Sequence, residues 1–214
     1  MHMTSVSCLE EIDDPLVLDA SVVVNLNATG FADRVLDAVP VGVFIPDPVV
    51  RELQRGIKMG HSDATDLNAL LTKGLVKTLK VPVAAQTEYI ALVSGSSTSS
   101  LGDGEAATIA SAFATGAWAS LDERKARKIC AERYPSIKVA STVDILSHPN
   151  VVSSLTKTEL STALLAALEV AHMQVHKHQI DWVINQIPFD RIENCISLPR
   201  SVRRAAIKST SKVG

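Results

Sequence analysis

Short apolar runs alternate with segments of helical character over the first 150 residues, and this alternation constrains the fold more than any other feature. The runs expected as strands are 16–19, 42–45, 75–79, 118–122 and 137–140. Helices are expected between and after them, at 20–28, 47–56, 62–73, 84–93, 104–115, 123–134 and 141–148. Strands that alternate with helices form parallel sheets covered on both faces. The sequence therefore predicts an α/β fold with a parallel five-stranded sheet.

Four acidic residues lie where a strand is expected to pass into a helix. Asp19 and Asp122 end strands, whereas Glu52 and Glu105 fall in the early turns of helices. Because ligands of parallel sheets bind outside the carboxyl ends of the strands, all four acids are expected in one crevice. Carboxylates gathered in one pocket repel each other, and hard divalent cations relieve that repulsion. This pattern favours metal-assisted cleavage of a phosphodiester.

The composition narrows the class of protein. Of 214 residues, 46% are hydrophobic and 21% are charged, as in ordinary globular proteins. The net charge of −2 gives no overall attraction to nucleic acid, so such contacts are expected from local patches. Cys8, Cys130 and Cys195 show no disulfide or CxxC pattern, which indicates a reducing cytoplasm. No apolar run reaches membrane-spanning length, so no membrane association is expected.

The last third of the chain has a different character. Thr156 and Glu159 have the spacing of a capping box. Apolar residues recur at helical spacing over 160–183, which predicts one long helix or two broken helices. Beyond residue 199 the chain bears cations and no acid, and this tail is expected either to bind RNA phosphates or to be a disordered terminus. We therefore expect two domains, an α/β domain over 15–150 and a helical extension with a basic tail over 151–214.

The acidic motifs resemble those of the PIN-domain family, which includes the VapC-type toxins. The residues that bear the resemblance are LDAS with Asp19 and Ser21, RELQRG with Glu52, LGDGEAATIASA with Glu105 and LDERKAR with Asp122. The helix start Gly-Glu-Ala, followed by the Leu-Asp-Glu element, is the most specific part and resembles one subgroup of the family. The resemblance covers residues 15–148.

This resemblance implies a three-layer α/β/α sandwich, ribonuclease activity and Mg²⁺ or Mn²⁺ as cofactor. Its catalytic and metal-binding residues would be Asp19, Glu52, Glu105 and Asp122. Asp103 is an additional carboxylate, which would either join the metal site or cap a helix that starts at Gly104. Ser21 matches a small hydroxyl residue that is expected to hydrogen-bond a carboxylate or a metal-bound water. The implied partners are RNA, an antitoxin protein and a second copy of the chain.

Cations beyond the last acid are expected to hold RNA phosphates. They are Arg124, Lys125, Arg127, Arg203 and Arg204. The alternatives are a solvated helix face and an ion pair between Arg127 and Glu123 at i,i+4. Glu169, His172 and His176 have the spacing of one helical face, and we interpret the two histidines as surface or partly buried residues rather than metal ligands.

Two other functions remain open from the sequence. The first is a PIN-fold module that binds RNA or protein with little or no catalysis, which the helical extension and basic tail would suit. The second is a phosphohydrolase acting on a small molecule. The second is weaker, because the chain lacks a glycine-rich phosphate loop after its first strand and lacks a second aspartate in LDAS.

Overall fold

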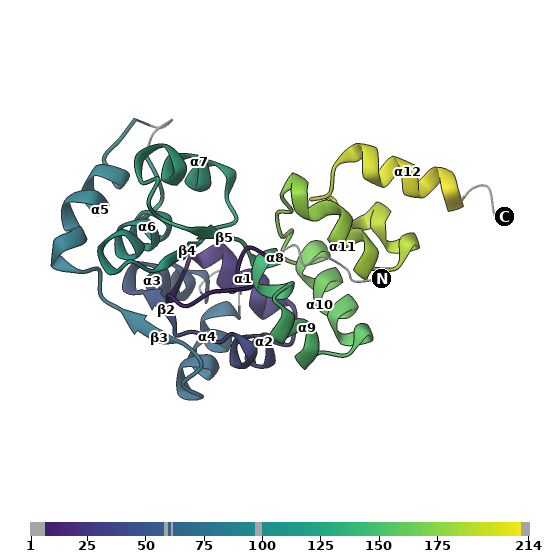
Figure 1. Cartoon of the computed structure of the whole chain (residues 1–214), viewed down its shortest axis with the longest axis horizontal. Coiled ribbons are helices and arrows are strands. Elements are labelled where there is room, and N and C mark those ends of the chain that lie inside the picture. The colour runs from purple at the N-terminus through teal and green to yellow at the C-terminus, as the bar shows by residue number, and fades with distance from the viewer. Residues whose placement is uncertain (1–6, 58–59, 61, 97–99, 211–214) are drawn as a thin grey trace.

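The computed structural model describes residues 7–57, 60, 62–96 and 100–210 (Figure 1). This part of the chain contains one parallel sheet in the order β3-β2-β1-β4-β5. The strands are β1 (Leu16–Leu18), β2 (Val43–Pro46), β3 (Lys77–Leu79), β4 (Trp118–Ser120) and β5 (Val139–Ala140). The predicted parallel five-stranded sheet is confirmed, with strands slightly shorter than expected.

Helices follow the strands at the expected places. Those of the first 150 residues are α1 (Ala20–Ala28), α2 (Ala32–Ala38), α3 (Asp47–Ile57), α4 (Asp63–Thr72), α5 (Gln86–Val93), α6 (Asp103–Thr115), α7 (Arg124–Arg133) and α8 (Thr142–Leu146). The later ones are α9 (Pro149–Ser154), α10 (Lys157–Glu169), α11 (Ile180–Gln186) and α12 (Arg200–Thr210). Single turns of 3₁₀-helix lie at η1 (Val83–Ala85) and η2 (Lys177–Gln179), and a longer one at η3 (Phe189–Asn194).

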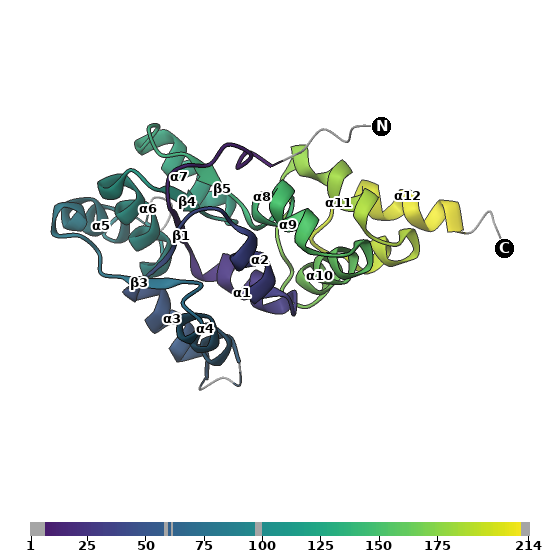
Figure 2. The same cartoon turned by 60° about the horizontal axis from the view of Figure 1, so that its bottom comes forward.

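Alternate strand residues pack into two separate hydrophobic clusters, one on each face of the sheet. In β1, Leu16 and Leu18 belong to one cluster with residues of α1, α2 and α4, whereas Val17 belongs to the other with residues of α5, α6 and α7. Both views show α5, α6 and α7 on one side of the strands and α1, α2 and α4 on the other (Figures 1 and 2). This is the expected three-layer α/β/α sandwich.

The helices after residue 150 pack directly against the sandwich. α10 contacts α1 and α9 contacts α2, and the larger hydrophobic cluster runs from Leu9 to Ala206. The two broken helices are present as α10 and α11, and residues 200–210 form a helix that buries Ala206. The division into two domains at residue 150 stays a prediction, and this shared core counts against it.

Within the described residues, no helix has the length and apolarity needed to cross a bilayer.

Candidate active site

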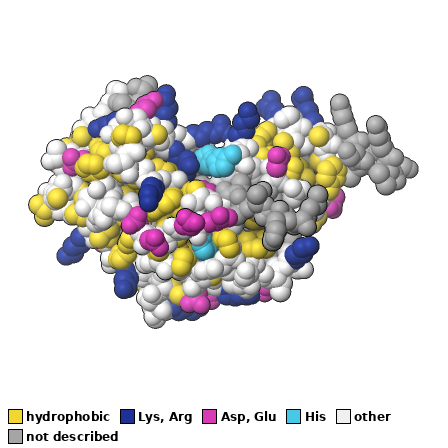
Figure 3. Space-filling model, in the orientation of Figure 1, with side chains coloured by type: hydrophobic (Ala, Val, Ile, Leu, Met, Phe, Trp, Pro, Cys, Tyr) yellow, Lys and Arg dark blue, Asp and Glu magenta, His cyan; other side chains and the backbone are white. Residues whose placement is uncertain are grey.

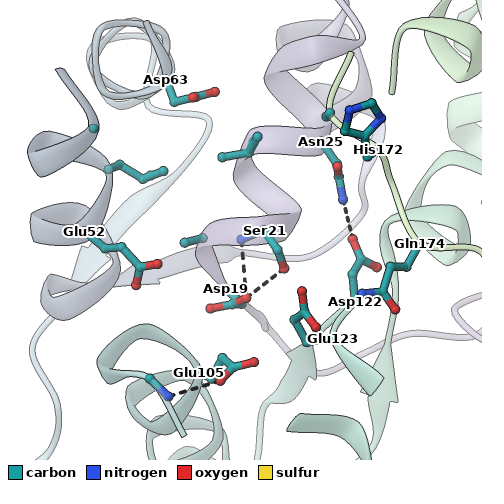
Figure 4. A pocket seen from close by; sticks show the side chains of 16 residues that line it. Asp19, Ser21, Asn25, Glu52, Asp63, Glu105, Asp122, Glu123, His172 and Gln174 are labelled. Atoms are coloured by element: carbon teal, nitrogen blue, oxygen red, sulfur yellow. Dashed lines mark hydrogen bonds between the residues drawn. The ribbon is translucent and has the colours of Figure 1, made fainter. Parts of the chain in front are cut away.

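One cavity of about 560 Å³ opens at the carboxyl ends of β1 and β4 (Figure 4). The four acids predicted for the site come from four elements that are far apart in the sequence, and all four line this cavity. They are Asp19, Glu52, Glu105 and Asp122. The topology explains the convergence, since β1 and β4 are neighbours in the sheet and α3 and α6 pack against each other.

Asp19 ends β1 and caps the start of α1. Its backbone is still extended, and its Oδ2 accepts hydrogen bonds from the backbone N–H and the hydroxyl of Ser21, at 3.3 and 2.8 Å, which begins the helix. Asp19 is thus an N-cap that also faces the cavity, and Ser21 makes the carboxylate contact expected of it. These bonds fix the direction of the carboxylate while its Oδ1 lies toward α6.

Asp122 follows β4 and is only 2% exposed. Its Oδ1 accepts the backbone N–H of Thr142 at 2.8 Å, and its Oδ2 accepts the Asn25 amide at 2.6 Å and the Thr142 hydroxyl. The three donors come from two elements, Asn25 from α1 and Thr142 from the start of α8. Asp122 therefore holds α1, β4 and α8 together at the base of the cavity, and protein donors occupy both of its oxygens.

Gly104, in the first turn of α6, lies between two of the acids. A Cβ atom at this position would stand 2.6 Å from Oε2 of Glu52 and 3.2 Å from Oδ1 of Asp19. The two carboxylate oxygens are therefore no further apart than the sum of these distances. Glu105, the next residue, accepts the backbone N–H of Gly102 and turns its carboxylate toward the cavity. The Gly-Glu-Ala motif thus places Glu105 at the cavity, and its glycine leaves room for the carboxylates of Glu52 and Asp19.

Burial and mutual repulsion raise the pKa values of all four acids. For Asp19 and Asp122, loss of hydration is the largest cause, partly offset by the hydrogen bonds described above. For Glu52 burial again comes first, followed by the charge of Asp19. The pKa of Glu105 is raised by burial and then by Asp19, while the Gly102 N–H acts in the opposite direction. A cation in the cavity would relieve the repulsion.

Asp103 does not line the cavity with the four acids. It borders a separate depression with Arg51, Gln54 and Arg55. The helix begins at Asp103 with Gly102 as its N-cap, so the predicted capping role of Asp103 is wrong. Residues two apart on a helix point about 200° from each other, which separates Asp103 from Glu105. A metal-binding role for Asp103 stays a prediction that this placement does not favour.

The predicted phosphate-binding cations fall into two groups. Arg124 and Lys125 are exposed at the start of α7, next to the cavity. Arg127 instead donates from Nη1 to the carbonyls of Leu121 and Ala140, each at 2.9 Å. Arg127 thereby joins the ends of β4 and β5. The ion pair with Glu123, the alternative expected from the sequence, is not formed among the described residues.

The other group lies on α12, at the end of the molecule opposite α5 (Figures 1 and 2). Arg203 donates from Nε to the carbonyl of Leu198, and it borders a shallow depression together with Arg200 and Arg204. RNA contacts by Arg203 and Arg204 stay predictions.

Several cavity residues were not predicted as site residues. They are Asn25, Asp63, Glu123, His172 and Gln174. Asp63 and Glu123 bring the carboxylates that line the cavity to six, and the sequence pair Asp-Glu after a strand could have indicated Glu123. The shared helical face of Glu169, His172 and His176 is wrong, because α10 ends at Glu169 and the residues from 172 to 176 form no helix. No local pattern marks His172 and Gln174, since they reach the cavity through tertiary packing.

The donor set fits a hard cation held partly through water. Within the described residues, no group of three His, Cys, Asp or Glu side chains is already arranged to hold a metal ion. Mg²⁺ retains several waters and binds to only one or two carboxylates directly, so wider spacing of the acids suits it. Asp19, Glu52 and Glu105 are the acids available for binding, because protein donors already surround Asp122.

An acid-lined cavity at the strand ends of a parallel α/β/α sandwich suits a nuclease type of fold. A family model described as a PIN domain matches residues 15–187, and the chain belongs to this family. PIN domains are generally nucleases that use divalent metals, which supports a hydrolase acting on nucleic acid. The match extends well beyond residue 148, into the helices of the expected extension. Searches among curated proteins and among solved structures found no match.

Proposed function

We propose that this protein is a metal-dependent ribonuclease. The observation that supports this proposal best is the convergence of Asp19, Glu52, Glu105 and Asp122 on one cavity, with Asp19 and Glu52 both against Gly104. A scaffold that only binds a partner has no use for buried carboxylates that repel each other. The family's nuclease character supports the same conclusion.

Each acid has a role that follows from its surroundings. Asp19 and Glu52 approach each other across Gly104 and, with Glu105, would hold Mg²⁺ or Mn²⁺. Such an ion lowers the pKa of a bound water and stabilises negative charge on the phosphate. Glu105 and Glu52 are partly exposed and have raised pKa values, so either can accept a proton from the attacking water. Asp122 acts through Asn25 and Thr142, which it holds at the cavity.

RNA is the proposed substrate, in keeping with the cations at the start of α7. The role of toxin in a toxin–antitoxin pair, with an antitoxin protein as partner, stays a prediction, as do a homodimer and a cytoplasmic location. Each depends on partners that lie outside this chain.

A cleavage assay with matched variants tests the proposal. Labelled unstructured and structured RNAs are incubated with the protein in Mg²⁺, in Mn²⁺ or in EDTA. We expect cleavage only with a metal ion, and a loss of about 100-fold or more in Asp19→Asn. Asp103→Asn is the matched control, because it removes a carboxylate from α6 that lies outside the cavity.

Two outcomes would contradict the nuclease. Cleavage that persists in EDTA or in Asp19→Asn would show that the cavity is not the site of reaction. Tight RNA binding with no cleavage under any metal would instead support the PIN-fold binding module.

A further inference from the structure

A segment from the last third of the chain forms one wall of the acidic cavity. We call residues 171–179, between α10 and α11, the arm. Ala171, His172 and Gln174 line the cavity with the acids. Met173 and Val175, which alternate with them, are buried in the hydrophobic cluster. Met173 and Val175 thus fix the arm to the protein interior, while His172 and Gln174 remain on the side that lines the cavity.

His172 is held in an unusual backbone conformation. Its φ is 55°, and among the described residues it is the one non-glycine residue with a positive φ. The left-handed region is unfavourable for residues with a Cβ atom, and it persists where the surroundings impose it, often at functional sites. Figure 4 shows the imidazole beside Asn25, at the rim of the cavity.

The arm is anchored to the turn that holds Asp122. Gln179 is fully buried, and its Nε2 donates to the hydroxyl of Ser141 at 2.8 Å while its Oε1 accepts the backbone N–H of His176. Ser141 directly precedes Thr142, which donates two hydrogen bonds to Asp122. The arm and Asp122 are therefore held by the same turn, Ser141-Thr142.

Beyond the cavity, the arm meets the cationic start of α7. The rings of His176 and His178 stack with centroids 6.2 Å apart. The pKa of His176 is lowered to about 4, chiefly by burial and then by the charges of Arg127, His178 and Arg124. The Nε2 atom of His176 is buried and has no hydrogen-bond partner among the described residues. Figure 3 shows histidines between lysines and arginines on this face. The positive charges of Arg124 and Arg127 beside this part of the arm suit an anion.

We propose that the arm binds the RNA strand on the side of the cavity next to α7. His172 and Gln174 contact the nucleotide at the acids, and the exposed Arg124 and His178 bind a phosphate further along the same strand, with the ring of His176 stacked behind that of His178. Four residues of extended chain span at most about 14 Å, so a strand of a few nucleotides covers both places. This inference rests on the proposed function, and it makes the substrate a single-stranded oligonucleotide rather than a mononucleotide.

Binding measurements on the full chain test the arm separately from catalysis. Fluorescein-labelled RNAs of two and eight nucleotides are titrated in Mg²⁺ against protein bearing Asp19→Asn, and fluorescence anisotropy gives Kd. His172→Asn removes the imidazole but keeps a residue that tolerates positive φ. The double variant His176→Asn with His178→Asn, and His178→Asn alone, remove the outer contacts. The controls are Val170→Ala, an exposed position just before the arm, and Lys77→Ala on β3.

We expect His172→Asn to raise Kd about tenfold for both RNAs. The variants at 176 and 178 should raise Kd for the longer RNA alone, and the controls should bind like the parent. Thermal melting identifies any variant that fails to fold. If the double variant fails, the Kd of His178→Asn, a substitution at an exposed position, tests the outer contact. The proposed role of the arm would be overturned by equal Kd values for both RNA lengths in the parent, or by arm variants that bind like the controls.

Cleavage by the protein without Asp19→Asn reports on the proposed function independently. If that protein cleaves RNA while the arm variants bind normally, the nuclease stands and the arm fails. If it never cleaves while the arm variants lose binding of the longer RNA, the arm stands and the nuclease fails.

Discussion

The substitution Gly104→Ala is expected to disturb the geometry of the acidic site while leaving the stability of the fold nearly unchanged. The added methyl would stand 2.6 Å from Oε2 of Glu52, closer than any ordinary contact, and 3.2 Å from Oδ1 of Asp19. The Glu52 carboxylate is the end of a flexible side chain and can swing away, whereas Asp19 is held by Ser21. We therefore expect the methyl to displace Glu52 and so remove one ligand from the cation site.

The two effects on stability oppose each other. Alanine is better than glycine inside a helix by about 1 kcal/mol, because it restricts the unfolded chain. Overpacking of a buried position costs about 1 to 3 kcal/mol, and the low end applies here because a side-chain terminus can move. The free energy of unfolding should thus change by about 1 kcal/mol or less, which shifts the Tm of a chain of this size by about 4 °C at most.

RNA cleavage in Mg²⁺ and calorimetric melting in EDTA measure the two quantities. We expect cleavage by Gly104→Ala to fall about 100-fold with a nearly unchanged Tm in EDTA. Gly102→Ala is the matched control, because its Cβ would meet Glu105 at an ordinary 3.8 Å. Parental cleavage by Gly104→Ala would refute the reasoning, since it would show that the approach of Glu52 to Asp19 is not needed.

Three further predictions follow from the site. Asp19→Asn should stabilise the metal-free protein by on the order of 1 kcal/mol, because it removes a buried, repelled charge and keeps a good N-cap; melting in EDTA measures this. Because the four site carboxyls have raised pKa values in the folded state, their stabilising contribution is present below their ordinary pKa of about 4 and is lost as pH rises through the raised values; Tm in EDTA should fall as the pH is raised above about 4, and Mg²⁺ should reduce that fall. Arg127→Ala should destabilise the fold by about 2 kcal/mol in urea unfolding, because it removes two hydrogen bonds at the ends of β4 and β5.

Each of these predictions has its own control. Asp103→Asn should raise Tm in EDTA by less than Asp19→Asn, because the charge of Asp103 acts on Glu52 less than that of Asp19 does, and an equal gain would argue against repulsion within the cavity. Asp19→Asn should flatten the pH dependence, and an unaltered profile would mean that other groups cause it. Lys128→Ala removes an exposed cation of the same helix, whose ion pair with Glu132 is worth little. A loss equal to that of Arg127→Ala would contradict the bridging role.

The sheet and the four acids could be predicted because their signals are local. The sequence Pro46-Asp47-Pro48 marks the change from strand to helix, since β2 ends at Pro46 and α3 begins at Asp47, within the expected helix at 47–56. Asp19 and Asp122 follow apolar runs directly, so the parallel topology alone brings them to one edge. The metal-binding and capping roles considered for Asp103 could not be judged from its nearness to Glu105 in the sequence. The direction of its side chain depends on which residue begins α6.

The arm could not be predicted in the same way. His172 and Gln174 point to the cavity because Met173 and Val175 are buried and because Gln179 bonds Ser141, and both facts depend on long-range packing. Periodicity alone suggested a helical face that does not exist.

The anchoring of the arm bears on how short a working version of this protein can be. A chain cut after residue 150 would keep all five strands and all four acids. It would still lose one side of its cavity and uncover the parts of α1 and α2 on which α10 and α9 now rest. The smallest excisable unit therefore ends no earlier than Gln179, close to the end of the family match at residue 187.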